Sequence, residues 1–424
     1  MSGIILVLGV ACLIVPQRWG IIGATKDGAA LKEVKALLAR NNPEQAIKVL
    51  ETLGDPTTLS SDALLLLIQS CYQQSDLDRA LTLCDLMETR PDANPEFHFW
   101  RGNARIALWQ ASRAEAEFKH CLQLGVVPEG ASLQLAKLYA MQARQKEVEP
   151  LIWELYTRGK PPPSQKPESF DATDRVLEPN LLVQLLIIQY FGWEAAAMID
   201  QLQLFHEGDS GDFEAQLAYG RACVLTDRYS DAWELLLDCV QRRPDHAQAS
   251  VVLLECALAM NDMEFVREWL ADHREDFGDV AELCDIRGQI LMRDDHYEQA
   301  ASCFRQAVKL DPYSHASYHR LGRCLAQMGQ RSEALEYVQI GRKLNLTMSH
   351  MLKTLDAMQS GNYTSDECMI VARGCHEFGR PKIAIAWAKI AAALGATKQE
   401  ADALHKQIES HPEGTIVMML RKDD

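Results

Sequence analysis

Apolar residues along the chain recur at the spacing of amphipathic helices, as Leu321 and Leu325 do one helical turn apart. Residues at this spacing lie on one face of a helix, where a neighbouring element can cover them. Alanine, leucine, glutamine and glutamate dominate long stretches, and only 7% of residues are aromatic. This composition favours helices over strands, so we expect an all-α fold.

A small residue recurs at steps of 34 residues in two separate series. The series are Ala46, Ala80 and Ala114, then Ala232, Val266, Ala300 and Ala334, with Gly220, Gly288 and Gly322 twelve residues ahead of three of them. Small residues at these places let the two helices of a hairpin approach closely, and Pro244 and Pro312 end second helices. Each unit is therefore predicted to be a helical hairpin whose apolar face is covered by the next unit.

The stretch from Gly288 to Pro312 resembles a tetratricopeptide repeat, with Tyr297, Ala300, Phe304 and Ala307 at the positions that the family pattern requires. The following stretch is similar, with Tyr318, Leu321, Gly322 and Ala334. The resemblance extends over roughly nine-tenths of the chain. It implies an α-α superhelix, a tetratricopeptide-like solenoid of about ten helical hairpins.

The repeat register is lost in two places, which divides the chain into segments. We expect a hydrophobic N-terminal segment at 1–24, an N-terminal repeat block at 27–158, a Pro-rich linker at 159–178, a central repeat block at 179–348, an extra helix at 349–364, a C-terminal repeat unit at 365–411 and a tail at 412–424. The linker is interpreted as a surface insertion or as a hinge between two halves of the array.

Residues 3–15 are all apolar or small. A helix that crosses a bilayer needs about 20 apolar residues, and the run reaches that length only by extending to Ile22 through Pro16 and Arg18. A short membrane anchor, a signal peptide and a buried capping helix all remain open. We favour a tether through residues 3–22, with the repeats facing the cytoplasm; the alternatives are a cytoplasmic chain, or an exported one if residues 1–24 are a signal.

Composition narrows the classes of partner. The chain carries 59 acidic and 43 basic residues, a formal net charge of -16. Because nucleic acid is bound through positive surfaces, we do not expect it as a partner. The 12 cysteines include no CxxC pair, and we expect nearly all of them to pack as small hydrophobic residues in the repeat core.

Sequence signatures of enzymes are missing: no phosphate-binding loop, dinucleotide fingerprint, HExxH or GxSxG motif occurs. His315 and His319 lie one helical turn apart, but two histidines without a third ligand make a weak metal site. We therefore expect no enzyme activity, no cofactor and no metal centre, although an enzyme with an unrecognised site is a distant third possibility.

In the tetratricopeptide family, first helices line a concave groove and the ninth residue of each unit faces into it. The resemblance implies a binding surface formed by Gln69, Asn103, Lys137, Arg221, Glu255, Gln289, Arg323 and Arg373, to which we add His319. We predict a non-catalytic scaffold that binds a protein or peptide in this groove. The alternative is a helical structural or regulatory subunit of a multiprotein complex, either an enzyme or a secretion assembly. The sequence does not predict the oligomeric state.

Overall fold

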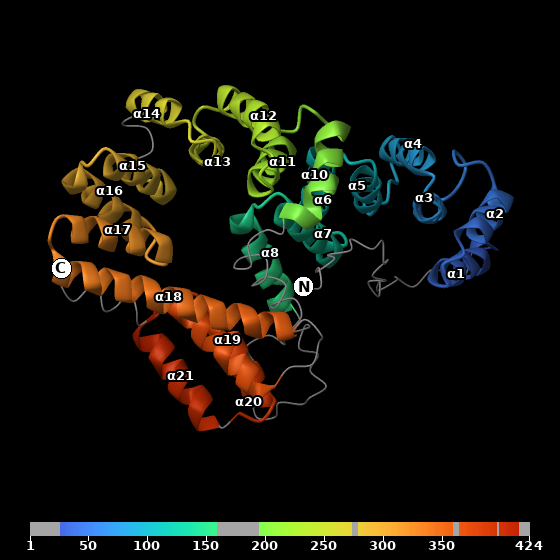
Figure 1. Ribbon diagram of the computed structural model, residues 1–424. Coiled ribbons are helices and arrows are strands. Elements are labelled where there is room, and N and C mark those ends of the chain that lie inside the picture. The colour runs from blue at the N-terminus through green and yellow to red at the C-terminus, as the bar shows by residue number, and fades with distance from the viewer. Residues whose placement is uncertain (1–25, 159–194, 274–278, 359–363, 397, 415–424) are drawn as a thin grey trace. The chain divides into compact units, whose positions relative to one another are not determined.

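The computed structural model describes residues 26–158, 195–273, 279–358, 364–396 and 398–414 (Figure 1). These residues form twenty α-helices and no strand, which confirms the predicted all-α fold of repeated hairpins. The predicted hydrophobic segment 1–24 and the predicted linker 159–178 lie outside the described residues.

The helices group into two compact units. The first unit contains α1 (Lys26–Ala39), α2 (Pro43–Leu53), α3 (Ser61–Gln73), α4 (Leu77–Glu88), α5 (Phe97–Ala107), α6 (Ala111–Leu124), α7 (Pro128–Met141), α8 (Gln145–Arg158), α10 (Ala195–Gly208) and α11 (Phe213–Leu225). Its helices pack as antiparallel neighbours in chain order, α1 with α2, α3 with α4, α5 with α6 and α7 with α8.

The second unit continues the same alternation. It contains α12 (Tyr229–Arg242), α13 (Ala247–Ala259), α14 (Met263–Asp272), α15 (Ala281–Arg293), α16 (Tyr297–Leu310), α17 (His315–Gln327), α18 (Arg331–Met358), α19 (Ser365–Glu377), α20 (Pro381–Ala393) and α21 (Lys398–Ser410). The helices α13, α15 and α17 begin 34 residues apart, at Ala247, Ala281 and His315. The step found in the sequence is therefore the step between first helices.

The turn inside each hairpin repeats one backbone geometry. The residues in the left-handed region are Asn41, Ser75, Trp109 and Ala143 in the first unit, and Asp227, Asn261, Asp295, Gly329 and Gly379 in the second. The next amide bonds back to the carbonyl five residues earlier, as from Asp76 N to Cys71 O at 2.9 Å. This bond closes the first helix with a left-handed residue, and Asn, Asp and Gly adopt that conformation most readily.

The periodic glycines lie where two helices cross. A Cβ atom added at Gly288 would lie 2.7 Å from the Phe304 ring, and one at Gly322 would lie 2.5 Å from Val338 Cγ2. Phe304 also belongs to a buried cluster with Leu321 and Leu325 of the following hairpin. Small residues therefore bring the paired helices together, and one hairpin's apolar face is covered by the next.

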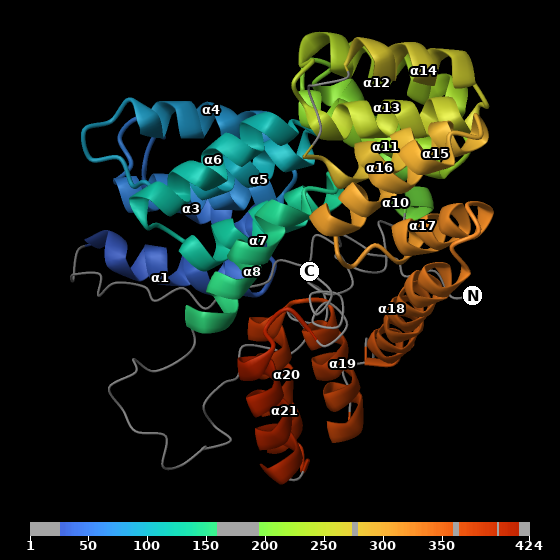
Figure 2. The same cartoon turned by 90° about the vertical axis from the view of Figure 1, so that its left-hand side faces the viewer.

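The helix α18 differs in length from the other second helices. It has 28 residues and runs without interruption from Arg331 to Met358, so residues 349–358 of the predicted extra helix continue the preceding one (Figure 2). The physical reason is that residues 342–358 contain neither proline nor glycine, the residues that most strongly end helices. Near its end α18 packs on α19, where Met351 lies against Gly374.

The predicted localisation, a membrane-anchored chain with its repeats facing the cytoplasm, is corrected by the structure. Among the helices that the structure describes, none combines the length and the apolar character needed to cross a bilayer. Residues 3–22, on which that prediction depended, lie outside the described residues.

Candidate functional site

A hollow of about 280 Å³ lies in the second unit between three first helices, α13, α15 and α17. Consecutive members of this series contact each other directly, α13 with α15 and α15 with α17. The side chains that line the hollow are Glu255, Leu258, Ala281, Glu282, Asp285, Ile286, Gln289, Asp311, Ser314, Ser317 and Arg320. The hollow is thus built by three successive repeats, since each contributes one wall.

Asp285 organises the floor of this hollow. Its side chain is buried, with 6% of the residue exposed. Asp285 Oδ1 accepts a hydrogen bond from Ser317 Oγ at 2.8 Å, and Oδ2 accepts from Gln289 Nε2 and from Arg320 Nη1, each at 2.8 Å. Because Ser317 and Arg320 belong to α17, this carboxylate fixes the position of one repeat's side chains against the next.

The side chains that line the hollow include more acidic than basic groups. Four carboxylates, from Glu255, Glu282, Asp285 and Asp311, line it together with one cation, Arg320, and Arg320 is already paired with Asp285. Burial and the nearby Glu282 raise the pKa of Asp311, although the amide of Tyr313 and the charge of Arg380 oppose the shift. Burial is the largest cause, and Glu282 adds like-charge repulsion, which disfavours a further negative charge beside these carboxylates.

Two of the nine predicted groove residues, Glu255 and Gln289, line this hollow. Asn103, the corresponding residue of α5, is buried in the first unit. Its Nδ2 donates to Phe99 O at 2.7 Å, and its Oδ1 accepts from Gln134 Nε2 of α7 at 2.9 Å. In both units a polar side chain of one first helix therefore bonds to the next first helix.

The other predicted groove residues are not brought together around the hollow. Gln69, Lys137 and Arg221 are half-buried on α3, α7 and α11, while Arg323 and Arg373 are exposed on α17 and α19. Burial lowers the pKa of Lys137. The half-buried His319 has its Cδ2 atom close to where a side chain would begin at Gly341 of α18, so its ring faces the partner helix of its own hairpin.

The residues on the remaining walls of the hollow were not predicted from the sequence. These are Ala281, Glu282, Asp285, Ile286, Asp311, Ser314, Ser317 and Arg320, together with Leu258. A usable signal was present, because Asp285 and Gln289 lie one helical turn apart on the same face of α15. The ninth-residue rule selects only one position per helix, so it misses a neighbour one turn away.

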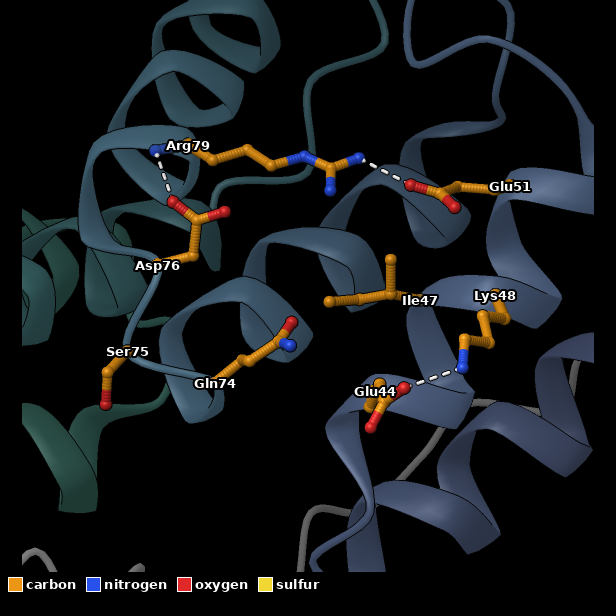
Figure 3. Close-up of a pocket in the computed structure, with 8 residues that line it drawn as sticks. All are labelled: Glu44, Ile47, Lys48, Glu51, Gln74, Ser75, Asp76 and Arg79. Carbon is orange, nitrogen blue, oxygen red and sulfur yellow. Dashed lines mark hydrogen bonds and ion pairs between the residues drawn. The ribbon is translucent and has the colours of Figure 1, made fainter.

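A second hollow, of about 460 Å³, lies in the first unit beside α2 and the turn before α4 (Figure 3). Its charged side chains pair with each other in solvent: Lys48 Nζ lies 2.6 Å from Glu44 Oε1, and Arg79 Nη2 lies 2.9 Å from Glu51 Oε1. Exposed ion pairs of this kind contribute little to the free energy of folding, and their flexible side chains give a binding site little specificity. We therefore regard the hollow on α13, α15 and α17 as the stronger candidate.

The side-chain types that commonly bind metal ions are spread over the part of the chain that the structure describes. No group of three or more histidine, cysteine, aspartate or glutamate side chains there is arranged to hold a metal ion. Eleven cysteines lie in that part as free thiols, ten of them buried and Cys303 half-buried. Their burial agrees with the predicted packing role.

Comparison with known proteins gives the same family at two places in the chain. A family model described as tetratricopeptide repeat matches residues 281–314, and a second model of the same description matches residues 31–96. No curated protein matches the sequence. The first match covers α15, α16 and the turn that follows, so it includes Asp285 and Gln289 of the hollow.

The solved structures that match this chain share little of its sequence and have low TM-scores. The APC/C hetero-tetramer Cut9-Hcn1 is 15% identical, with 90% of this chain and 83% of that chain covered and a TM-score of 0.32. A tetratricopeptide repeat protein from Parabacteroides merdae is 14% identical, with 70% and 98% covered and a TM-score of 0.29. MamA MSR-1 C2 is 20% identical, with 39% and 96% covered and a TM-score of 0.30. With repeat models matching two separate stretches and hairpins recurring at the repeat's own step, this chain contains tetratricopeptide repeats.

Proposed function

We propose that the protein is a non-catalytic scaffold that binds a protein or an extended peptide at the hollow on α13, α15 and α17. Tetratricopeptide repeats generally bind protein partners and are typically non-catalytic, so the family suggests a protein–protein interaction scaffold. The choice of this surface is our own inference from the packing of the second unit.

One observation supports the proposal most: three successive repeats together form a single polar hollow. Asp285 fixes Gln289 of its own helix α15 and Arg320 of the neighbouring helix α17 by charge-assisted hydrogen bonds, which are stronger than hydrogen bonds between neutral groups. Side chains held in place before binding lose little conformational freedom on binding, and this favours affinity. An extended peptide lying across the three helices would meet a different fixed set of groups at each repeat.

Site-specific photocrosslinking tests this proposal. A photoreactive residue would replace Gln289, which lines the hollow, and in a matched variant Glu268, which is exposed on the second helix α14. In extract from cells that naturally produce the protein, we expect Gln289 to crosslink to a defined partner and Glu268 not to. Equal crosslinking at both positions, or none at either, would contradict the proposal. An obligate structural subunit would instead aggregate or oligomerise when produced alone.

A further inference from the structure

We infer that the hollow on α13, α15 and α17 receives a cationic side chain, lysine or arginine, from the bound partner. This inference deepens the proposed function and depends on it. The carboxylates of Glu255, Glu282 and Asp311 come from three different segments and line one hollow. The charge and the dimensions of the hollow thus specify the occupant as a basic peptide segment.

The buried carboxylate of Asp285 is not the group that meets the ligand. Both of its oxygens already accept hydrogen bonds, one from Ser317 and the other from Gln289 and Arg320. The same pairing engages Arg320, the one cation in the lining. The charge of Arg380, which is not part of the lining, also acts on Asp311, but the pKa of Asp311 is still raised overall. Asp285 is therefore a positioning residue that holds the floor while the carboxylates around it face the occupant.

The remaining carboxylates suit a cation. Glu282 is exposed at the rim, with a 3.4 Å hydrogen bond from Gln248 Nε2 to its Oε1. Asp311 Oδ1 accepts from the backbone amide of Tyr313 at 3.1 Å, an interaction that leaves the carboxylate fixed in direction. A cation between these groups relieves their mutual repulsion, whereas an acidic group would add to it. Lysine and arginine supply three and five donors for such acceptors.

The size of the hollow limits the occupant to part of a chain. Sites for whole drug-sized ligands have volumes of roughly 300–1,000 Å³, and this hollow, at about 280 Å³, lies below that range. Leu258 and Ile286 add apolar surface to the lining. A long aliphatic stem with a charged end matches this combination, because the stem packs on the apolar side chains while the head reaches the carboxylates.

Fluorescence anisotropy with labelled twelve-residue peptides tests the inference on the full chain. Four peptides share one serine and alanine background and carry four lysines, four arginines, four glutamines or four glutamates. We expect the two basic peptides to bind and the other two not to bind, with affinity falling as salt rises. Glu282→Gln should weaken binding of the basic peptides about fivefold and Glu282→Lys about tenfold or more, as expected for a lost and a reversed ionic contact.

The matched control is Glu268→Gln, which changes the net charge by the same amount on exposed α14, outside the hollow. If the carboxylates of the hollow attract the peptide, Glu268→Gln should leave the affinity unchanged, because it lowers the overall negative charge without altering the hollow. Asp311→Asn, which keeps an acceptor for the Tyr313 amide, should weaken binding as Glu282→Gln does. Circular dichroism checks that each variant is folded.

Three outcomes would overturn the inference. Equal losses in Glu282→Gln and Glu268→Gln would show that the attraction comes from the acidic surface as a whole. The glutamine peptide could bind as tightly as the basic peptides and also bind more weakly to Glu282→Gln. The hollow would then be a peptide site without a preference for cations. No binding of any basic peptide would exclude the cationic occupant, and the scaffold proposal would then be judged by crosslinking at Gln289 alone.

Discussion

At the scale of single residues, the first unit contains a nearly buried ionic cluster between α5 and α6. Glu117 Oε2 lies 2.7 Å from His98 Nδ1, and Glu117 Oε1 lies 2.7 Å from Arg101 Nε. The side chains of Glu117 and Arg101 are 11% and 8% exposed. Burial acts to raise the pKa of Glu117, but the hydrogen bonds and charges of His98 and Arg101 outweigh it and lower the pKa.

A lowered carboxyl pKa makes the stability of the first unit depend on pH. The stabilisation is present above the unfolded pKa of about 4.3 and is lost as pH falls through the folded value. Glu117→Gln should therefore cost about 2–4 kcal/mol at pH 7, because it leaves Arg101 buried without this partner. The cost should shrink as pH falls below the unfolded pKa of about 4.3 and through the lowered folded pKa, because Glu117 then becomes protonated in the unmodified protein too. Urea unfolding at several pH values measures this; a cost independent of pH would contradict it.

At the scale of helices, the hairpins follow from local sequence signals. Ala80 and Ala300 are buried, and Asn41, Asp295 and Gly329 occupy left-handed turn positions where their residue types are favoured. The end of α18 was not predicted, because the repeat pattern calls for a stop near residue 348 while the chain there contains no helix-breaking residue. Periodicity indicates where units recur, but local propensity decides where a helix ends.

One contact in the first unit joins helices distant in sequence and could not be predicted. The carboxylate of Asp212 caps its own helix α11 by accepting from the amides of Glu214 and Ala215, and it also accepts from the amide of Ser112, at the start of α6, at 2.9 Å. Nearby, the rings of Trp109 and Phe205 meet edge to face, with their centroids 5.1 Å apart. One capping residue, Asp212, therefore serves two helices and joins the start of α11 to the start of α6.

Replacing this shared cap should destabilise the first unit more than an ordinary cap does. Asp212→Ala removes acceptors from two helix starts, and we expect a loss of about 2–3 kcal/mol, against about 1 kcal/mol for a single cap. Asp76→Ala, which removes a cap used only by α4, is the matched control. Hydrogen exchange should show faster opening of both α6 and α11 in Asp212→Ala. Faster exchange in α11 alone would contradict the double role.

At the scale of the whole chain, the family and the repeat step were readable from sequence, but the arrangement of the hollow was not. Glu255 and Gln289 were found by their ninth position in the repeat, whereas Glu282, Asp285 and Arg320 were not. Which side chains meet depends on how closely successive first helices approach. That distance is set by the packed core of each hairpin, and a one-dimensional pattern does not contain it.

The repeat architecture also predicts how far the effect of a destabilising substitution extends along the chain. Each hairpin is stabilised mainly by its neighbours, so a local loss should weaken with distance in sequence. Phe304 has no exposed surface and packs on Leu321 and Leu325 of the next hairpin, and Phe304→Ala should cost about 3–5 kcal/mol. Hydrogen exchange should accelerate most in α15 to α18 and least in α1 to α4. The exposed Leu346→Ala should change little. Uniform acceleration that includes α1 to α4 would mean that all repeats unfold as one cooperative core and not as an array of neighbours.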